Sequence, residues 1–247
     1  MTQRILLVTH DDGSRADRAS RFLVARGHAV EWTCPAQGGD LPEPGGAFDA
    51  AIVYGGLDSV NAREEKTYLK AELDWIGRWT ATGKPYLGLC LGGQLLAHSL
   101  GGGVARHADG LHEHGFIEVR PTDAGREILP GPLHVYQAHY EGFDLAHGAE
   151  LLMTGETYAN QCFRYGANAY GLQFHPEVTP QLMVRWLDED RGRMDYPGVH
   201  SRERQIADSQ RYDEPMGAWF EGFLESWLAS PCRDTAPPAR VPFKQPG

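Results

Sequence analysis

The chain has 247 residues, of which 41% are hydrophobic, and a formal net charge of −10 at pH 7. This hydrophobic content is sufficient for a folded core, which excludes a disordered chain, and the acidic balance disfavours nucleic acid as a partner because it repels phosphate backbones. No apolar run is long enough for a membrane span or a signal peptide, so we expect a cytoplasmic protein without membrane contact.

Strand and helix patterns alternate over the first hundred residues. The continuous apolar run at 5–8 predicts a strand buried on both faces, and further strands are predicted at 30–33, 50–54 and 85–89. Apolar residues at helical spacing predict helices at 14–26, 65–82 and 91–100. This alternation is typical of an α/β fold, with an open, mostly parallel sheet and helices on both faces.

The pattern changes after residue 103. Short strands are predicted at 116–119, 133–137 and 151–154, followed by an apolar strand at 169–174, a helix at 181–187 and a C-terminal helix around 219–228. We expect one domain over residues 1–190. Residues 191–230 would add a charged segment and a docked C-terminal helix to it, and 231–247 would be a proline-rich extended tail.

A cysteine lies at the fourth predicted strand-to-helix turn. The sequence Gly88-Leu-Cys90-Leu-Gly92-Gly-Gln94 has the layout of a nucleophile elbow, with small residues where neighbouring backbone must come close. Such a turn would place the thiol at the carboxyl end of the sheet and at a helix N-terminus, which favours a thiolate. An isolated cysteine of this kind is equally often a small buried hydrophobic residue. No C-x-x-C pair is present, which disfavours a disulfide framework or a zinc site. Cys34 and Cys162 have no accompanying histidine and carboxylate motif, so we read them as structural.

A histidine and a carboxylate end the apolar strand at 169–174. A cysteine nucleophile needs an imidazole that takes and returns its proton, and the imidazole needs a group that fixes its orientation. In extended backbone, residues i and i+2 face the same side, so Glu177 can reach the ring of His175, and Pro176 favours that conformation. Without the cysteine, the simplest interpretation is a strand-end histidine paired with a surface acid.

Two glycines follow the third predicted strand. Gly55 and Gly56 are expected beside the end of the fourth strand, where a backbone N–H can point at a developing oxyanion. Together with the N–H of Leu91, the residue after the cysteine, this would supply two donors. The alternative is an ordinary strand-to-helix turn.

Taken together, the three segments resemble the class I (triad) glutamine amidotransferases, and in particular stand-alone members similar to the amidotransferase domain of GMP synthase. The resemblance covers roughly residues 4–190, with the Gly-Gly loop, the G-x-C-x-G-x-Q elbow and the H-P-E segment in the family's order. It implies a flavodoxin-like fold and no cofactor or metal. It also implies that a separate synthase could accept the ammonia, because residues 191–247 contain no synthase domain.

The resemblance also implies roles for single residues. Cys90 would attack the side-chain amide of glutamine, His175 oriented by Glu177 would transfer the proton, and a γ-glutamyl thioester would form and hydrolyse. The oxyanion donors would be Gly56 and Leu91. Substrate contacts would come from the residues Gly55, Gln94, His139 and Tyr140.

Departures from the family pattern keep two other functions open. Relatives often read Gln-Trp-His-Gly-Asp where this chain has Gln137-Ala-His-Tyr140-Glu, and the added bulk of Tyr140 weakens the case for strict glutamine specificity. A γ-glutamyl peptidase acting on γ-glutamyl peptides or glutathione conjugates is therefore an alternative. A non-catalytic partner or sensor is the other.

Two further features are given their simpler interpretation. No Gly-rich phosphate loop is present, and the acidic loop His10-Asp-Asp-Gly-Ser14 after the first strand disfavours a nucleotide site. His107, His112 and His114 could be interpreted as metal ligands, but without a partner motif we read them as polar loop residues.

Overall fold

The structure is a computed structural model, and it describes residues 2–11, 17–189 and 195–229. Its strands are β1 (Arg4–Val8), β2 (Ala29–Thr33), β3 (Ala50–Val53), β4 (Tyr86–Leu89), β5 (Val104–Arg106), β6 (Glu113–Pro121), β7 (Leu133–His139), β8 (Glu141–Phe143), β9 (Ala149–Thr154), β10 (Asn160–Tyr165) and β11 (Ala169–Leu172). Its α-helices are α1 (Arg18–Ala25), α2 (Thr67–Ala81), α3 (Leu91–Ser99), α4 (Pro180–Asp188) and α5 (Arg202–Ala229).

One mixed sheet organises the described chain. Its strand order is β2-β1-β3-β4-β11-β10-β9-β6-β7, and a small antiparallel pair, β5 with β8, lies apart from it. The half from β2 to β11 is parallel, whereas β10, β9, β6 and β7 pair antiparallel. The predicted α/β fold is confirmed. The carboxyl ends of the parallel strands β3, β4 and β11 lie side by side, which brings the three predicted segments together.

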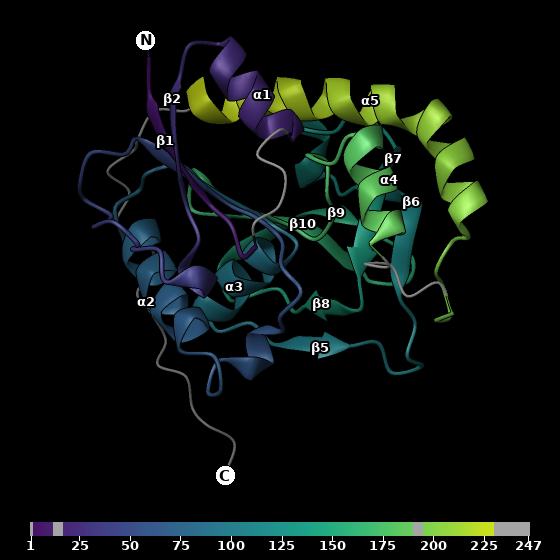
Figure 1. Cartoon of the computed structure of the whole chain (residues 1–247), viewed down its shortest axis with the longest axis horizontal. Helices are drawn as coiled ribbons and strands as arrows, with labels where there is room; N and C mark the ends of the chain where they lie inside the picture. The colour runs from purple at the N-terminus through teal and green to yellow at the C-terminus, as the bar shows by residue number, and fades with distance from the viewer. Residues whose placement is uncertain (1, 12–16, 190–194, 230–247) are drawn as a thin grey trace.

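Helices cover both faces of the sheet, as Figure 1 shows. The helices α1, α4 and α5 pack on one face, and α2 and α3 pack on the other. The strand β1 shows why its apolar run is continuous, since Ile5 and Leu7 enter the first core and Leu6 and Val8 enter the second. Among helices in the described ranges, none combines the length and apolar character that a bilayer crossing requires.

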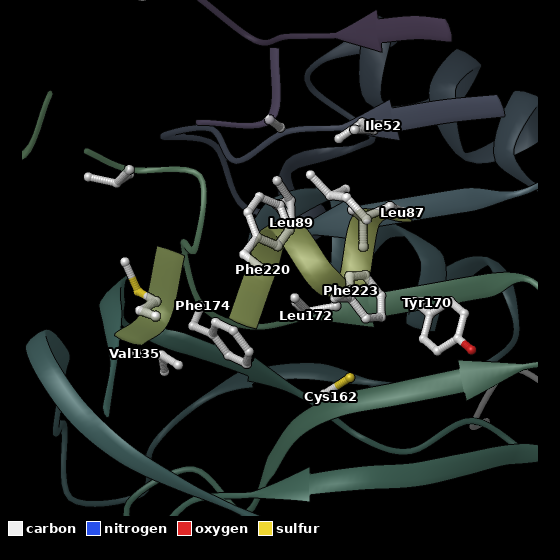
Figure 2. Close-up of a cluster of buried hydrophobic side chains, with 14 of the residues drawn as sticks. Ile52, Leu87, Leu89, Val135, Cys162, Tyr170, Leu172, Phe174, Phe220 and Phe223 are labelled. Atoms are coloured by element: carbon white, nitrogen blue, oxygen red, sulfur yellow. The ribbon is translucent and has the colours of Figure 1, made fainter. Parts of the chain in front are cut away.

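The C-terminal helix closes the core on the α1 face. In Figure 2, Phe220 and Phe223 of α5 lie against Leu87, Leu172 and Tyr170 of the central strands. The indole N–H of Trp227 donates to the carbonyl of Asn168 at 3.2 Å. This arrangement ties the end of the described chain to the strands that carry the site.

Several local expectations differ from the structure. The helix α5 begins at Arg202, well before 219, because its first half buries polar residues such as Gln205 and Ser209 that carry no apolar signal. The strands β5, β8 and β10 have no counterpart among the predicted elements, and in β10 polar residues obscure the alternation. The apolar strand β11 ends at Leu172, so the residues up to 174 leave the sheet. The start of the expected 14–26 helix and the 231–247 tail lie outside the described residues.

Candidate active site

Cys90 occupies a strained turn between β4 and α3. Its φ of 50° and ψ of −107° make it the one non-glycine residue with positive φ in the described ranges. The turn requires glycine on both sides of the cysteine. A Cβ at Gly88 would lie 2.3 Å from the carbonyl oxygen of Gly92, and a Cβ at Gly92 would lie 2.1 Å from that of Val53. The geometry is that of a nucleophile elbow.

His175 meets the cysteine from the end of β11. Its imidazole is buried and hydrogen-bonded to the Cys90 side chain, and its Nδ1 lies 2.8 Å from Oε1 of Glu177. The expected contact between positions 175 and 177 is therefore present, but its backbone is a turn and not extended strand. The N–H of Val178 donates to the carbonyl of His175 at 3.3 Å, and Pro176 takes the turn position that favours proline.

The charges around His175 favour its protonated form. Burial lowers the pKa of His175, but the negative charges of Glu177 and Cys90 and the hydrogen bonds to both outweigh burial and raise the pKa to about 10. The ring also packs edge-on against Trp186, with centroids 5.2 Å apart. An imidazolium held in this way can stabilise a thiolate and can supply a proton to a leaving group.

Arg18 holds the turn that carries His175 and Glu177. Its guanidinium donates to the carbonyls of Pro176 at 2.7 Å and Val178 at 3.0 Å, and it pairs with Asp213 of α5 at 2.8 Å. Its backbone N–H donates to the carbonyl of Glu177 at 2.8 Å. Sequence reasoning missed this residue, because an arginine at a helix start carries no signal of a partner about 160 positions away.

The two glycines after β3 border the cysteine and the histidine. A Cβ at Gly55 would lie 2.6 Å from Cε1 of His175 and 3.4 Å from Cβ of Cys90. A Cβ at Gly56 would lie 2.9 Å from the Leu91 side chain. Within the described residues, neither the N–H of Gly56 nor that of Leu91 donates to a protein group. Both N–H groups therefore keep their hydrogen-bonding capacity at this point of the structure.

Two glutamines lie beneath the thiol. The amide nitrogen of Gln173 lies 3.9 Å from the Cys90 sulfur, and its oxygen lies 3.4 Å from Nε2 of Gln94. Gln94 also donates to the carbonyl of Glu141 at 2.9 Å. Sequence reasoning assigned Gln94 a substrate contact but did not identify Gln173, although the residue stands two positions before His175.

His139 and Tyr140 have different surroundings. His139 is buried, with Nδ1 2.9 Å from the carbonyl of Glu141 and Nε2 3.0 Å from Glu113. Both ring nitrogens are therefore occupied by protein groups. Tyr140 is half-buried, and the Arg106 guanidinium lies 4.9 Å from the centre of its ring. Burial raises the pKa of Tyr140, and the charge of Glu141 raises it further.

A pocket opens next to the histidine and the Gly-Gly loop. Its lining includes Gly55, Gly56, His175, Glu177 and Trp186. The side chain of Leu57 also lines it and is 70% exposed. The pocket therefore borders the His175 side of the site, and Cys90 is not among its lining residues.

The three histidines considered as metal ligands have separate surroundings. His112 stacks on Tyr196. His114 is buried in strand β6 and not in the expected loop, and its Nε2 lies 3.1 Å from the hydroxyl of Tyr136. The backbone N–H of His107 contacts the Tyr158 hydroxyl. Across the ranges that the structure describes, no group of three or more His, Cys, Asp or Glu side chains is arranged to hold a metal ion.

Comparison with known proteins identifies one family. Residues 19–189 match the family model described as glutamine amidotransferase class-I. The chain is 30% identical over 188 residues to YfeJ, a glutamine amidotransferase-like protein of Salmonella typhimurium, covering 73% of this chain and 78% of that one. It is 28% identical over 181 residues to one subunit of the glutamine-hydrolysing GMP synthase of Thermococcus kodakarensis, covering 70% of this chain and 89% of that one.

Solved structures show the same relationship. The crystal structure of a glutamine amidotransferase from Thermotoga maritima superposes with a TM-score of 0.84 at 27% identity, covering 93% of this chain and all of that one. The family model spans well over half of the chain. The chain therefore belongs to the class I glutamine amidotransferase family, enzymes that use a cysteine nucleophile.

Proposed function

We propose that the chain hydrolyses the side-chain amide of glutamine through Cys90, His175 and Glu177 and delivers the ammonia to a separate acceptor enzyme. One observation carries this proposal. A thiol on a positive-φ elbow is hydrogen-bonded to an imidazole whose other nitrogen is held by a carboxylate at 2.8 Å. Three groups in this order are what nucleophilic catalysis by cysteine requires.

The first half of the reaction forms a thioester. His175 holds the proton that leaves the Cys90 thiol, and the sulfur attacks the amide carbon. The carbonyl electrons move onto the oxygen, which accepts hydrogen bonds from the N–H groups of Gly56 and Leu91. As the carbonyl re-forms, the C–N bond breaks, His175 gives its proton to the departing nitrogen, and ammonia leaves. Glu177 keeps the imidazole oriented throughout.

The second half releases glutamate. His175 takes a proton from water, which attacks the γ-glutamyl thioester carbon, and the C–S bond breaks as the tetrahedral intermediate collapses. The sulfur leaves as a thiolate stabilised by the imidazolium. Gln94, fixed by the carbonyl of Glu141, would contact the substrate, and Gly55 would border it. His139 would act on the substrate only indirectly, because protein groups occupy both of its ring nitrogens.

The ammonia acceptor is proposed to be a second protein. The relative from Thermococcus is named as one subunit of a glutamine-hydrolysing GMP synthase, which supports a division of this kind. Co-purification of the tagged chain with a synthase, and an increase in glutamate release on adding it, would support the proposal. Equal glutamate release with and without every candidate synthase would contradict it.

A γ-glutamyl peptidase remains the second candidate because of Tyr140. Its half-buried ring and the Arg106 guanidinium 4.9 Å from the ring centre are an aromatic and a cationic group that the second candidate would use to contact a substrate larger than glutamine. A panel of glutamine, γ-glutamyl dipeptides and a glutathione conjugate separates the two. The amidotransferase proposal expects the highest kcat/KM with glutamine and none for Cys90→Ala. A higher kcat/KM with the dipeptides would favour the peptidase.

A further inference from the structure

A buried ion pair lies directly behind the Gly-Gly loop and has no role in the mechanism above. His10, just after β1, and Glu72, in the middle of α2, have side chains that are 2% and 0% exposed. Nε2 of His10 lies 3.0 and 3.2 Å from the two carboxylate oxygens of Glu72. Burying such a pair is costly and gives little net stability, so its presence calls for another explanation.

The other nitrogen of His10 holds the loop. Nδ1 lies 2.9 Å from the carbonyl oxygen of Gly55, the residue whose peptide bond contains the N–H of Gly56. The carbonyl can only accept, so Nδ1 carries a hydrogen and donates it. At the other nitrogen, the carboxylate of Glu72 is the acceptor, so a second proton lies between Nε2 and Glu72. The contact with the carbonyl therefore requires a hydrogen on Nδ1, whichever group holds the proton shared with Glu72.

Packing holds the same peptide in place. A Cβ at Gly56 would lie 2.8 Å from Cβ of His10, so the histidine lies against the backbone of the loop. The far side of the loop is anchored by Asp58, which pairs with Lys66 and Tyr68. Tyr68 and Glu72 are one turn apart on α2, so one helix face supports both ends of the loop.

We propose that His10, held by Glu72, is a positioning residue that fixes the Gly55–Gly56 peptide so that its N–H points at the oxyanion formed above Cys90. This inference rests on the proposed function, because it assigns His10 a part in the same transition state. A peptide plane has one soft rotation at each end, and a hydrogen bond to its carbonyl oxygen fixes the direction of its N–H. Donors aligned in advance need no reorganisation during the reaction.

The charge of the pair supports this role. Burial lowers the pKa of His10, but the charge and hydrogen bond of Glu72 and the carbonyl of Gly55 outweigh burial and raise it. The charge of Asp11 adds to the increase. A protonated ring donates a charge-assisted hydrogen bond to the loop, which is stronger than a neutral one.

A matched pair of variants tests the proposal. In a Glu72→Gln background, which removes the buried charge, His10→Asn keeps an amide N–H near the position of Nδ1, and His10→Leu has nearly the same shape without a donor. We expect kcat for glutamine to be about 10–100-fold lower with leucine than with asparagine, and KM to agree within about threefold, because the donor acts in the transition state. Lys70→Ala, on the exposed face of α2, is the control for changes in this helix.

A second readout separates positioning from general damage. Iodoacetamide alkylates Cys90 by displacing iodide from a saturated carbon, so this step forms no oxyanion. We expect equal alkylation rates in the two His10 variants. Equal kcat values would overturn the proposal, and so would a parallel fall of kcat and alkylation, which would mean that His10 only maintains the fold.

Two further outcomes are defined. If wild type hydrolyses no γ-glutamyl amide, the proposed function fails and this inference fails with it. If wild type is active and the two His10 variants have equal kcat, this inference alone fails.

Should the leucine variant not fold, nitrogen NMR of wild type at pH 7.5 tests the contact between His10 and the loop. A protonated Nδ1 on His10 supports the loop contact, and an unprotonated Nδ1 overturns it.

Discussion

Gly55→Ala places one methyl group between the members of the proposed triad. The new Cβ would lie 2.6 Å from Cε1 of His175, and ordinary van der Waals contact begins at 3.4 Å. The imidazole must therefore recede by about 0.8 Å, or the loop must move by a similar amount. The φ of Gly55 is not in the left-handed region, so the backbone itself accepts alanine.

The expected effect is on turnover more than on stability. A misplacement near 1 Å in a catalytic geometry costs on the order of 10²-fold in rate, and 10²-fold corresponds to about 2.7 kcal/mol. Overpacking would cost about 1–3 kcal/mol of folding free energy. We expect kcat for glutamine to fall about 10²-fold and alkylation of Cys90 to slow as well, because the contact between sulfur and imidazole is disturbed.

Steady-state glutamate release, alkylation and urea unfolding measure the three quantities. Gly45→Ala is the matched control, because that exposed glycine has negative or extended φ and a Cβ there would meet nothing within 4 Å. A Gly55→Ala protein that folds like the control and keeps kcat within about threefold of it would refute the assignment of this loop to the site.

Three further predictions concern a carboxylate, an ion pair and the core. Glu177→Gln removes the charge that raises the pKa of His175, so we expect kcat to fall about 10²-fold or more with little change in KM. The pKa of His10 is raised by Glu72, so its contribution to stability is present below about pH 6.5 and is lost as pH rises through the folded pKa. Urea unfolding should therefore show a larger loss of stability from pH 6 to pH 9 in wild type than in Glu72→Gln. Phe220→Ala should lower the free energy of unfolding by about 3–5 kcal/mol, because this ring is fully buried.

Each of these has an outcome that would contradict it. Activity of Glu177→Gln within about threefold of wild type would remove the carboxylate from the mechanism. Parallel pH profiles of stability in wild type and Glu72→Gln would mean that the pair does not hold a proton as described. For the core, Val24→Ala on the exposed side of α1 is the control. A decrease in the free energy of unfolding for Phe220→Ala no larger than that for Val24→Ala would contradict the docking of α5.

The parallel half of the fold was predictable because its strands and turns carry signals within short stretches of sequence. Buried parallel strands need continuous apolar runs, and the glycines around Cys90 mark a turn where backbone groups come within contact distance. Once the parallel strands β3, β4 and β11 are neighbours, the residues that follow their carboxyl ends must lie close together. The order of the Gly-Gly loop, the cysteine turn and the H-P-E segment was therefore enough to predict both the fold family and the candidate triad.

The supporting residues were not predictable, because their signals are non-local. Arg18 contacts the turn after β11, and Glu72 contacts His10 across 62 positions, yet each reads as an ordinary polar residue in its own segment. The first half of α5 likewise buries Gln205 and Ser209, which hydropathy assigns to the surface. Only the folded packing reveals which polar residues are buried and paired.

Covalent labelling of the thiol tests the proposed chemistry most directly. Wild type, Cys90→Ala and Cys162→Ala are incubated with a chloroketone analogue of glutamine, and the intact mass of each is measured. Burial raises the pKa of the Cys162 thiol, so that residue should not react. We expect one adduct per chain in wild type and Cys162→Ala, none in Cys90→Ala, and protection by glutamine. No adduct in wild type, or an equal adduct in Cys90→Ala, would contradict the assignment of Cys90 as the nucleophile.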